Sequence, residues 1–175
     1  MKKEVCHLLY IIQTRMSIRL FKQQHIAKDD LDSILQSAIL APSGKNSQPW
    51  RFVVVQQDKA LINSIADLMQ HSRFARTADC LICVFLDKEN SYDYVKDCQA
   101  IGACIENMLL TATALGIGSC WIGEILNRQD EVKELLQVDK DRYDLMAIVS
   151  LGYPLRESKT KTSRKPLSEC VISYK

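Results

Sequence analysis

The chain has 175 residues, of which 47% are hydrophobic and 25% charged, and its formal net charge at pH 7 is +2. This length suits one domain with a sizeable core, and the composition is that of an ordinary soluble globular protein. The small net charge gives no electrostatic reason to expect nucleic acid or an anionic membrane as a partner. An anionic ligand would therefore have to be held by a local cluster of cations.

The first apolar stretch predicts an amphipathic helix and not a secretion signal. Apolar residues recur at the i, i+3, i+4, i+7 spacing of one helix face, at Val5, Leu8, Leu9 and Ile12. Polar residues interrupt the stretch, and no small-residue cleavage site follows it. We expect a helix that docks on an apolar surface, in a cytoplasmic protein.

The seven cysteines are scattered along the chain. Cys80 and Cys83 have the C-x-x-C spacing, but they lie in an apolar run that predicts a strand, where these two positions point to opposite faces. The three histidines are far apart in the sequence. We expect no metal site, and cysteines that act as small hydrophobic residues in a reducing compartment.

The apolar pattern predicts one α+β domain over residues 1–155, followed by a basic arm over residues 156–175. Helices are predicted from a cap at Asp29-Asp30 to residue 41 and over 59–69, 94–115 and 131–136, and strands over 52–55, 81–86, 119–122 and 145–151. The 94–115 helix is apolar almost all round from Ala100 onward, so it should be central and buried. Continuous apolar strands indicate a sheet that is covered on both faces.

The end of the chain has a different character. Residues 156–166 are rich in Lys, Arg, Ser and Thr and cannot build a core, whereas Cys170-Val171-Ile172 has the pattern of a strand. An extended arm that reaches a partner subunit would account for both features. The surplus of apolar helix surface also favours an oligomer.

Three clusters of residues could bind a ligand. The first, residues 15–19, has Arg15 and Arg19 at i and i+4 with the hydroxyl of Ser17 between them, which could hold a phosphate and a second polar edge. Taken alone, such charges more often line a solvated face.

The second cluster is the loop Ala41-Pro42-Ser43-Gly44-Lys45-Asn46-Ser47-Gln48-Pro49-Trp50. Two prolines frame it, Gly44 allows a close approach of the backbone, and Ser43 and Asn46 offer hydrogen bonds. A plain helix-to-strand turn anchored by Trp50 explains the same residues equally well.

The third cluster is Gly116-Ile117-Gly118-Ser119-Cys120-Trp121-Ile122-Gly123. Glycines that flank apolar residues suit a flat ring lying against the backbone. The spacing is not that of a dinucleotide-binding motif, because a third glycine and a following acidic residue are missing.

Together, and in this order, the three clusters resemble the motifs of the nitroreductase family. Residues 15–19 resemble its Arg-Arg-Ser-x-Arg motif, residues 42–50 its Pro-Ser-x-x-Asn-x-Gln-Pro-Trp motif, and residues 116–123 its Gly-x-Gly-Ser-Cys-Trp-Ile-Gly motif. Residues 149–154, followed by basic residues, resemble the C-terminal signature of the family. The resemblance implies a three-layer α+β fold: a central mixed, mostly antiparallel sheet, helices on both sides, and a buried central helix.

The resemblance also implies a homodimer with FMN bound at the interface. Arg15 and Ser17 match the positions that hold the flavin phosphate. Arg164 matches a C-terminal phosphate ligand, which Lys161 or Lys165 would assist. An FMN phosphate is close to dianionic, so arginines from distant parts of the chain would bring the site near neutrality.

The remaining matched positions surround the flavin ring. Arg19 matches the basic residue near its pyrimidine edge, and Ile122 with Gly123 matches the stretch whose backbone amide faces the flavin N5. The loop that the other subunit contributes is matched by Pro42, Ser43, Gly44 and Asn46. Met16 departs from the family pattern, which has an arginine or another polar residue there, and this departure predicts weaker FMN retention.

The implied function is that of an FMN-dependent oxidoreductase with a ping-pong cycle. A hydride from NADH or NADPH passes through flavin N5 to an electron-poor acceptor such as a nitroaromatic, a quinone or a flavin. No catalytic side chain is expected, because the cofactor carries the chemistry. Two alternatives stay open: a flavoenzyme of this fold that performs dehalogenation or flavin breakdown, and a flavin-binding protein with little turnover.

Overall fold

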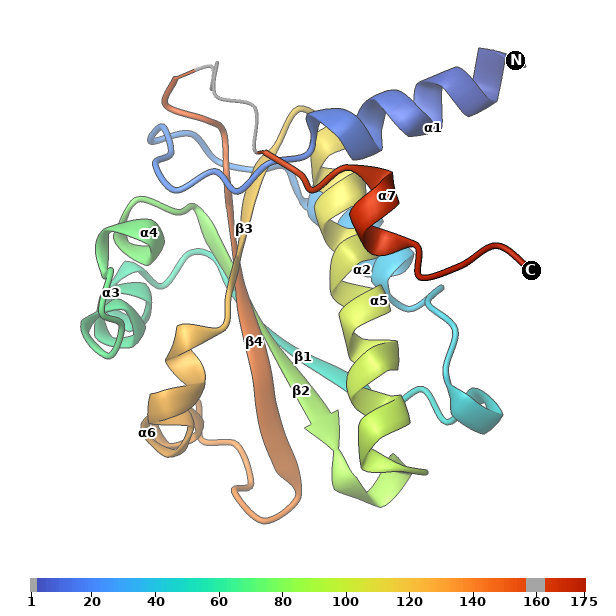
Figure 1. Ribbon diagram of the computed structural model, residues 1–175. Coiled ribbons are helices and arrows are strands. Elements are labelled where there is room, and N and C mark those ends of the chain that lie inside the picture. Colours follow the sequence, from blue (N-terminus) through green and yellow to red (C-terminus); the bar gives the residue numbers. More distant parts are fainter. Residues whose placement is uncertain (1–2, 157–162) are drawn as a thin grey trace.

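A four-stranded sheet forms the centre of the computed structural model, which describes residues 3–156 and 163–175 (Figure 1). The strands run in the order β1-β2-β4-β3, and each pairs antiparallel with its neighbours. Their bounds are β1 Trp50–Val55, β2 Cys80–Asp87, β3 Gly118–Ile122 and β4 Tyr143–Gly152. The one parallel pairing among the described residues is an isolated bridge between Ser17 and Ser119.

Helices cover both faces of this sheet (Figure 1). One core lies between the sheet and helices α2 (Lys28–Ala38) and α5 (Tyr94–Ala114). The other lies between the sheet and helices α3 (Lys59–Asp67), α4 (Arg73–Arg76) and α6 (Gln129–Leu135). The three-layer α+β fold predicted from the sequence is therefore confirmed.

Helix α5 is the central helix that the sequence predicted. It begins after Asp93, whose carboxylate accepts a hydrogen bond from the Lys96 amide, and Gly116 follows its end with a positive φ of 72°. Its buried residues are Asp97, Ala100, Ile101, Cys104, Ile105, Met108, Leu109 and Ala112. The two groups of predicted site residues lie near opposite ends of this helix.

The alternation of strand β2 separates the two cysteines of the C-x-x-C sequence. Cys80 belongs to the core beneath α5, whereas Cys83 belongs to the core on the opposite face of the sheet. Both are free thiols with no exposed surface, and burial raises the pKa of the Cys80 thiol to about 12. The predicted role of both cysteines as small core residues is confirmed.

Two predicted element boundaries were wrong. Helix α2 begins at Lys28, so Asp29 and Asp30 lie in its first turn, where they face the positive end of the helix dipole and do not cap it. Near the end of the chain, helix α7 (Leu167–Cys170) replaces the start of the predicted strand. Val171 has an extended backbone, but residues 171–175 pair with no described strand of the same chain.

Helix α1 (Lys3–Thr14) leaves its apolar face uncovered. Side chains on this face are 40–54% exposed, namely Val5, Leu8, Leu9 and Ile12. The docking surface that the sequence predicted for this helix is thus not supplied by the described residues of the same chain. None of the helices described is long and apolar enough to cross a membrane.

Candidate functional site

The segment after α1 lies along the edge of the sheet formed by β3 and the end of β4. The Ile18 amide donates to the Ser119 carbonyl at 2.8 Å, and the Leu155 amide donates to the Leu20 carbonyl at 3.0 Å. These bonds fix residues 17–21 against the two strands. The side chains of Ser17 and Arg19, on either side of Ile18, remain exposed.

Two paired glycines make room for this segment. Gly118 of β3 is opposite Gly152 of β4. A Cβ atom on Gly118 would lie 2.9 Å from the Cβ of Ile18, and one on Gly152 would lie 2.8 Å from Phe21. Gly118 therefore accommodates the N-terminal segment and not a flat ring, which corrects the reading of the Gly-x-Gly pattern from the sequence.

A cavity of about 400 Å³ opens beside this segment; we call it the arginine cavity. Its lining residues are Ser17, Ile18, Arg19, Leu20, Arg73, Leu155 and Arg156. They bring three guanidinium groups and one hydroxyl together, with no acidic side chain among them. The Arg19 guanidinium also lies 5.4 Å from the centroid of the Phe74 ring, a cation–π contact that holds it in place.

Arg73 is a lining residue that the sequence analysis missed. It begins α4, a helix of only four residues. The surrounding sequence has neither a motif nor an apolar period that would have drawn attention to it. Only the packing of α4 beside residues 17–20 shows its place in the site.

Arg15 points elsewhere than Arg19. Its Nε lies 3.7 Å from Oε1 of Glu106 on α5, and its side chain is only 15% exposed. Burial raises the pKa of the nearby Cys120 thiol on β3, against the opposing charges of Arg19 and Arg15 and a hydrogen bond with Ser17. Cys120 therefore lies next to all three residues of the Arg-x-Ser-x-Arg pattern.

Met16 lines a separate small cavity of about 190 Å³. Ser119 lines the same cavity, and its buried hydroxyl has no hydrogen-bond partner among the described residues. Met16 is not among the lining residues of the arginine cavity. The positive charge of that lining is therefore not reduced by having methionine in place of arginine at this position.

The loop predicted to contact a flavin lies elsewhere on the molecule. Pro42, Ser43 and Gly44 line a cavity of about 330 Å³ together with residues 96–103 of α5. The loop is strained, because three residues other than glycine have left-handed backbones: Lys45 (φ 52°), Asn46 (φ 56°) and Gln48 (φ 48°). Each such residue costs of order 1–3 kcal/mol and persists only where its surroundings hold it, which is common at ligand sites.

The two groups of predicted site residues do not meet within one chain. The loop lies beside the N-terminal half of α5, whereas residues 15–19 lie near β3 and the C-terminal half (Figure 1). Lys96, near the loop, and Thr113, near Met16, are about 25 Å apart along the axis of α5 at about 1.5 Å per residue. A single site formed by both groups would need a second copy of the chain.

The other predicted residues are at the end of β3 and in the C-terminal segment. Ile122 is buried, whereas Gly123 is exposed and would have nothing within 4 Å of an added Cβ, so a ligand can approach its backbone. Arg164 is exposed and donates to the Ser163 carbonyl at 3.1 Å, and Lys165 is exposed as well. Neither is among the lining residues of the arginine cavity, and Lys161 lies outside the described residues.

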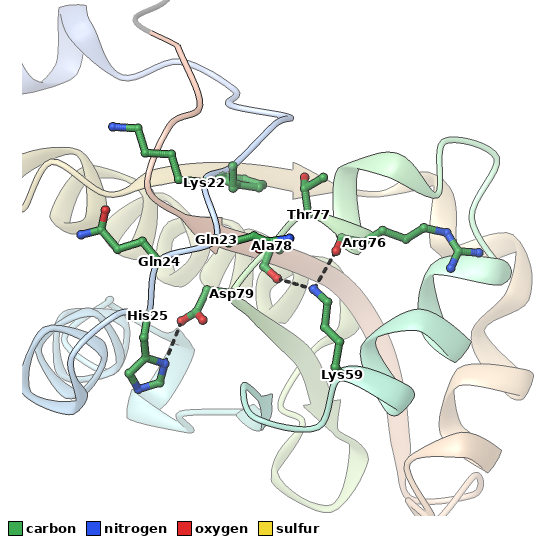
Figure 2. Close-up of a pocket in the computed structure, with 10 residues that line it drawn as sticks. Lys22, Gln23, Gln24, His25, Lys59, Arg76, Thr77, Ala78 and Asp79 are labelled. Atoms are coloured by element: carbon green, nitrogen blue, oxygen red, sulfur yellow. Dashed lines mark hydrogen bonds and ion pairs between the residues drawn. The ribbon is translucent and has the colours of Figure 1, made fainter.

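A further polar cavity, of about 370 Å³, lies between residues 21–25, the start of α3 and residues 76–79 (Figure 2). Two of its charged groups, those of Lys59 and Asp79, hold these segments together. The Lys59 ammonium donates to the carbonyls of Arg76 at 2.7 Å and Ala78 at 3.2 Å. Asp79 accepts hydrogen bonds from the Ile26 amide and the Gln56 side chain, both at 2.9 Å. Because these groups are already paired, the arginine cavity is the better candidate site.

Comparison with known proteins identifies the family. A model of the nitroreductase family matches residues 12–73 and 69–153. An Archaeoglobus fulgidus protein, provisionally named an NADH dehydrogenase/NAD(P)H nitroreductase, is 37% identical over 153 residues, which cover 85% of this chain and 86% of the relative.

Solved structures agree with this match. A provisionally named nitroreductase from Desulfovibrio desulfuricans, solved in complex with FMN, has 36% sequence identity and a TM-score of 0.91, covering 96% of each chain. An FMN-dependent nitroreductase from Clostridium difficile has 30% identity and a TM-score of 0.78, covering 88% of this chain and 91% of its own. The chain belongs to the nitroreductase family, as the sequence motifs predicted, and is an oxidoreductase of that family.

Proposed function

We propose that the protein is an FMN-dependent oxidoreductase that takes its hydride from NADH or NADPH. The arginine cavity carries this proposal, because three guanidinium groups and a hydroxyl with no acidic neighbour in the lining suit a dianionic phosphate or an electron-rich ring edge. A volume of about 400 Å³ is also within the usual range for a small-molecule site. The FMN in the Desulfovibrio relative supports the choice of cofactor.

The chain's own residues would bind and orient the cofactor. Ser17 would hold the phosphate from within the arginine cavity, and Arg15, which lies outside that cavity beside Glu106, would turn from Glu106 to join it. Arg164 would add a further charge from the C-terminal segment. Arg19 and Arg73 would supply positive charge to the pyrimidine edge. The exposed Gly123 lets its backbone come close to the ring, with Ile122 buried beneath as an anchor.

The FMN held by these residues would supply hydride transfer from the nicotinamide to an electron-poor acceptor such as a nitroaromatic, a quinone or a free flavin. The described residues provide position and electrostatics for this chemistry, and no side chain is required as an acid or a base. A ping-pong order follows if donor and acceptor use the same open face of the site.

We also propose that the working form is a homodimer in which the loop of one subunit completes the site of the other. The uncovered apolar face of α1 and the separation of the loop from residues 15–19 support this arrangement. Pro42, Ser43, Gly44 and Asn46 would then reach the flavin from the partner.

An FMN titration combined with a matched pair of arginine variants tests the cofactor site. Arg73 and Arg76 both belong to α4, but Arg73 lines the arginine cavity while Arg76 pairs with Asp67. Arg73→Ala should weaken FMN binding by about 1.5–3 kcal/mol, the scale of a hydrogen bond to a charged group. Arg76→Ala removes the same charge and should leave FMN affinity unchanged. Equal effects of the two variants would contradict the site.

Turnover is tested by NADH and NADPH oxidation with a panel of acceptors from the three classes. The proposal expects acceptor-dependent oxidation that requires FMN. Wild-type protein that shows no change in FMN fluorescence would overturn the cofactor assignment. Tight FMN binding without reduction by either nicotinamide would favour a flavin-binding protein in place of an enzyme.

A further inference from the structure

The loop of residues 43–48 needs support from outside itself, because three of its residues have left-handed backbones. Its internal hydrogen bonds are few. The Asn46 amide donates to the Ser43 carbonyl, the Ser47 amide to the Gly44 carbonyl, and the Gln48 amide to the Ser43 hydroxyl, each at 3.0 Å. These bonds close the turn, but they do not attach it to the rest of the protein.

Arg51 of β1 attaches the end of the loop, because its guanidinium donates to the Gln48 carbonyl at 3.0 Å, and Tyr92 attaches the beginning. Gly44 lies so close to it that an added Cβ would be 2.8 Å from Cδ1 and 3.2 Å from Cε1 of the tyrosine ring. The ammonium of Lys45, one of the left-handed residues, lies 4.2 Å from the ring centroid, and that of Lys96 lies 4.7 Å from it. The ring thus contacts the loop at two consecutive residues and links both of them to α5.

A buried carboxylate fixes the backbone of Tyr92 in turn. Asp97 has no exposed surface. Its Oδ2 accepts hydrogen bonds from the Tyr92 amide at 2.7 Å, the Ser91 hydroxyl at 2.8 Å and the Asp93 amide at 3.1 Å. Its Oδ1 receives the Ser47 hydroxyl at 3.5 Å, a weak second link to the loop.

We propose that Tyr92 is a positioning residue that holds the strained loop in the conformation in which it meets the partner's flavin. This inference rests on the proposed function, since the loop is taken to complete a flavin site. Tyr92 touches Gly44 and Lys45 and is not itself among the residues that would contact the cofactor. A loop that is held in place beforehand spares the flavin the cost of ordering it.

Three variants separate the ring from other effects. Tyr92→Ala removes the ring and Tyr92→Phe keeps it. Tyr94→Ala is a matched control that removes a neighbouring exposed tyrosine, the first residue of α5. If loss of the ring lowers the population of the competent loop tenfold, the Kd for FMN should rise about tenfold. Tyr92→Phe and Tyr94→Ala should bind FMN as the wild type does.

Hydrogen exchange on flavin-free protein gives a readout that does not depend on the cofactor. The amides of Asn46, Ser47 and Gln48 should exchange about tenfold faster in Tyr92→Ala, and at the wild-type rate in the other two variants. Unchanged exchange in Tyr92→Ala would overturn the positioning role. Faster exchange with an unchanged Kd would show that the loop does not act on flavin, and would overturn the inference as well.

The proposed function can fail separately. If the wild-type protein binds no FMN, the cofactor assignment is wrong whatever the exchange rates show. If the wild type binds FMN and Tyr92→Phe is as impaired as Tyr92→Ala, the hydroxyl and not the ring is needed, which contradicts the packing argument.

Discussion

Replacing Gly118 by alanine tests how closely the segment of residues 17–21, which we propose contacts the flavin, packs against the sheet. The new Cβ would lie 2.9 Å from the Cβ and Cγ2 of Ile18 and 3.0 Å from its Cγ1. Ordinary contacts begin near 3.4 Å, so Ile18 must retreat by roughly half an ångström. The Cβ of Ile18 cannot rotate away, so the backbone of the segment has to move.

The size of the effect follows from two opposing terms. Overpacking a well-filled site costs about 1–3 kcal/mol, and replacing glycine by alanine returns about 0.4–1 kcal/mol through the unfolded chain. We expect a net loss of about 1–2 kcal/mol in the free energy of unfolding. Ser17 and Arg19 flank Ile18 and would move with it, which should raise the Kd for FMN by roughly tenfold.

Urea unfolding of flavin-free protein measures the first quantity, and Gly123→Ala is its control. A Cβ at Gly123 would meet nothing within 4 Å, and the backbone there (φ -97°) suits alanine, so only the gain of about 0.4–1 kcal/mol through the unfolded chain should appear. Adding Ile18→Gly to the Gly118→Ala protein removes all three clashing atoms, Cβ included, so this second substitution should cost less there than in the wild type. Wild-type stability in Gly118→Ala, or additive effects of the two substitutions, would refute the reasoning.

Three other predictions concern a carboxylate, the thiols and the dimer. Asp87 has no exposed surface, and hydrogen bonds from Arg142 hold its pKa below the ordinary value of about 3.9. The ionised carboxylate therefore stabilises the fold above that value, and this stability is lost as the pH falls through the lowered pKa. Asp87→Asn should flatten the loss of stability between about pH 5 and pH 3 in urea titrations; an unchanged slope would contradict this role. Alkylation at pH 8 should leave the buried thiols of Cys80, Cys83 and Cys104 unmodified until the protein is denatured. Modification of any of these three thiols in the native protein would contradict this prediction. Leu8→Glu places a charge on the exposed apolar face of α1 and should give a monomer with weakened FMN binding; light scattering that still reports a dimer would contradict that interface.

The sequence predicted the layers of the fold because the apolar runs are long and continuous. Strand β2 is buried at all of its positions, and α5 is buried along most of one side. Such patterns need no knowledge of distant contacts. Arg73 could not be found in this way, since it reaches Arg19 only through packing between parts of the chain more than fifty residues apart.

The wrong predictions concern short segments, whose structure depends on contacts with distant parts of the chain. The pattern of Cys170-Val171-Ile172 suits a strand, but Pro166 is followed directly by a four-residue helix, and nothing in one described chain pairs with the residues after it. The glycine pattern at 116–118 was predicted to serve a ligand. Gly118 instead makes room for Ile18, whereas Gly123, the glycine that the sequence assigned to the flavin, has free space around it.

The arginine cavity also bears on Met16, the position where the chain departs from the family pattern and for which the sequence predicts weaker FMN retention. Three guanidinium groups that line one cavity without an acidic neighbour repel one another in the flavin-free protein, and each additional cation would increase that cost. An arginine in place of Met16 would face the neighbouring small cavity and add charge close to Arg15, which Glu106 already pairs. The positive charge in the lining of the arginine cavity comes from Arg19, Arg73 and Arg156. An apolar residue at position 16 leaves this charge unchanged. An anion that binds there relieves the repulsion, and this relief is part of its binding free energy. At the same FMN concentration, the rise in Tm of the wild type should therefore exceed that of an Arg73→Ala protein, whose Kd for FMN is expected to be higher.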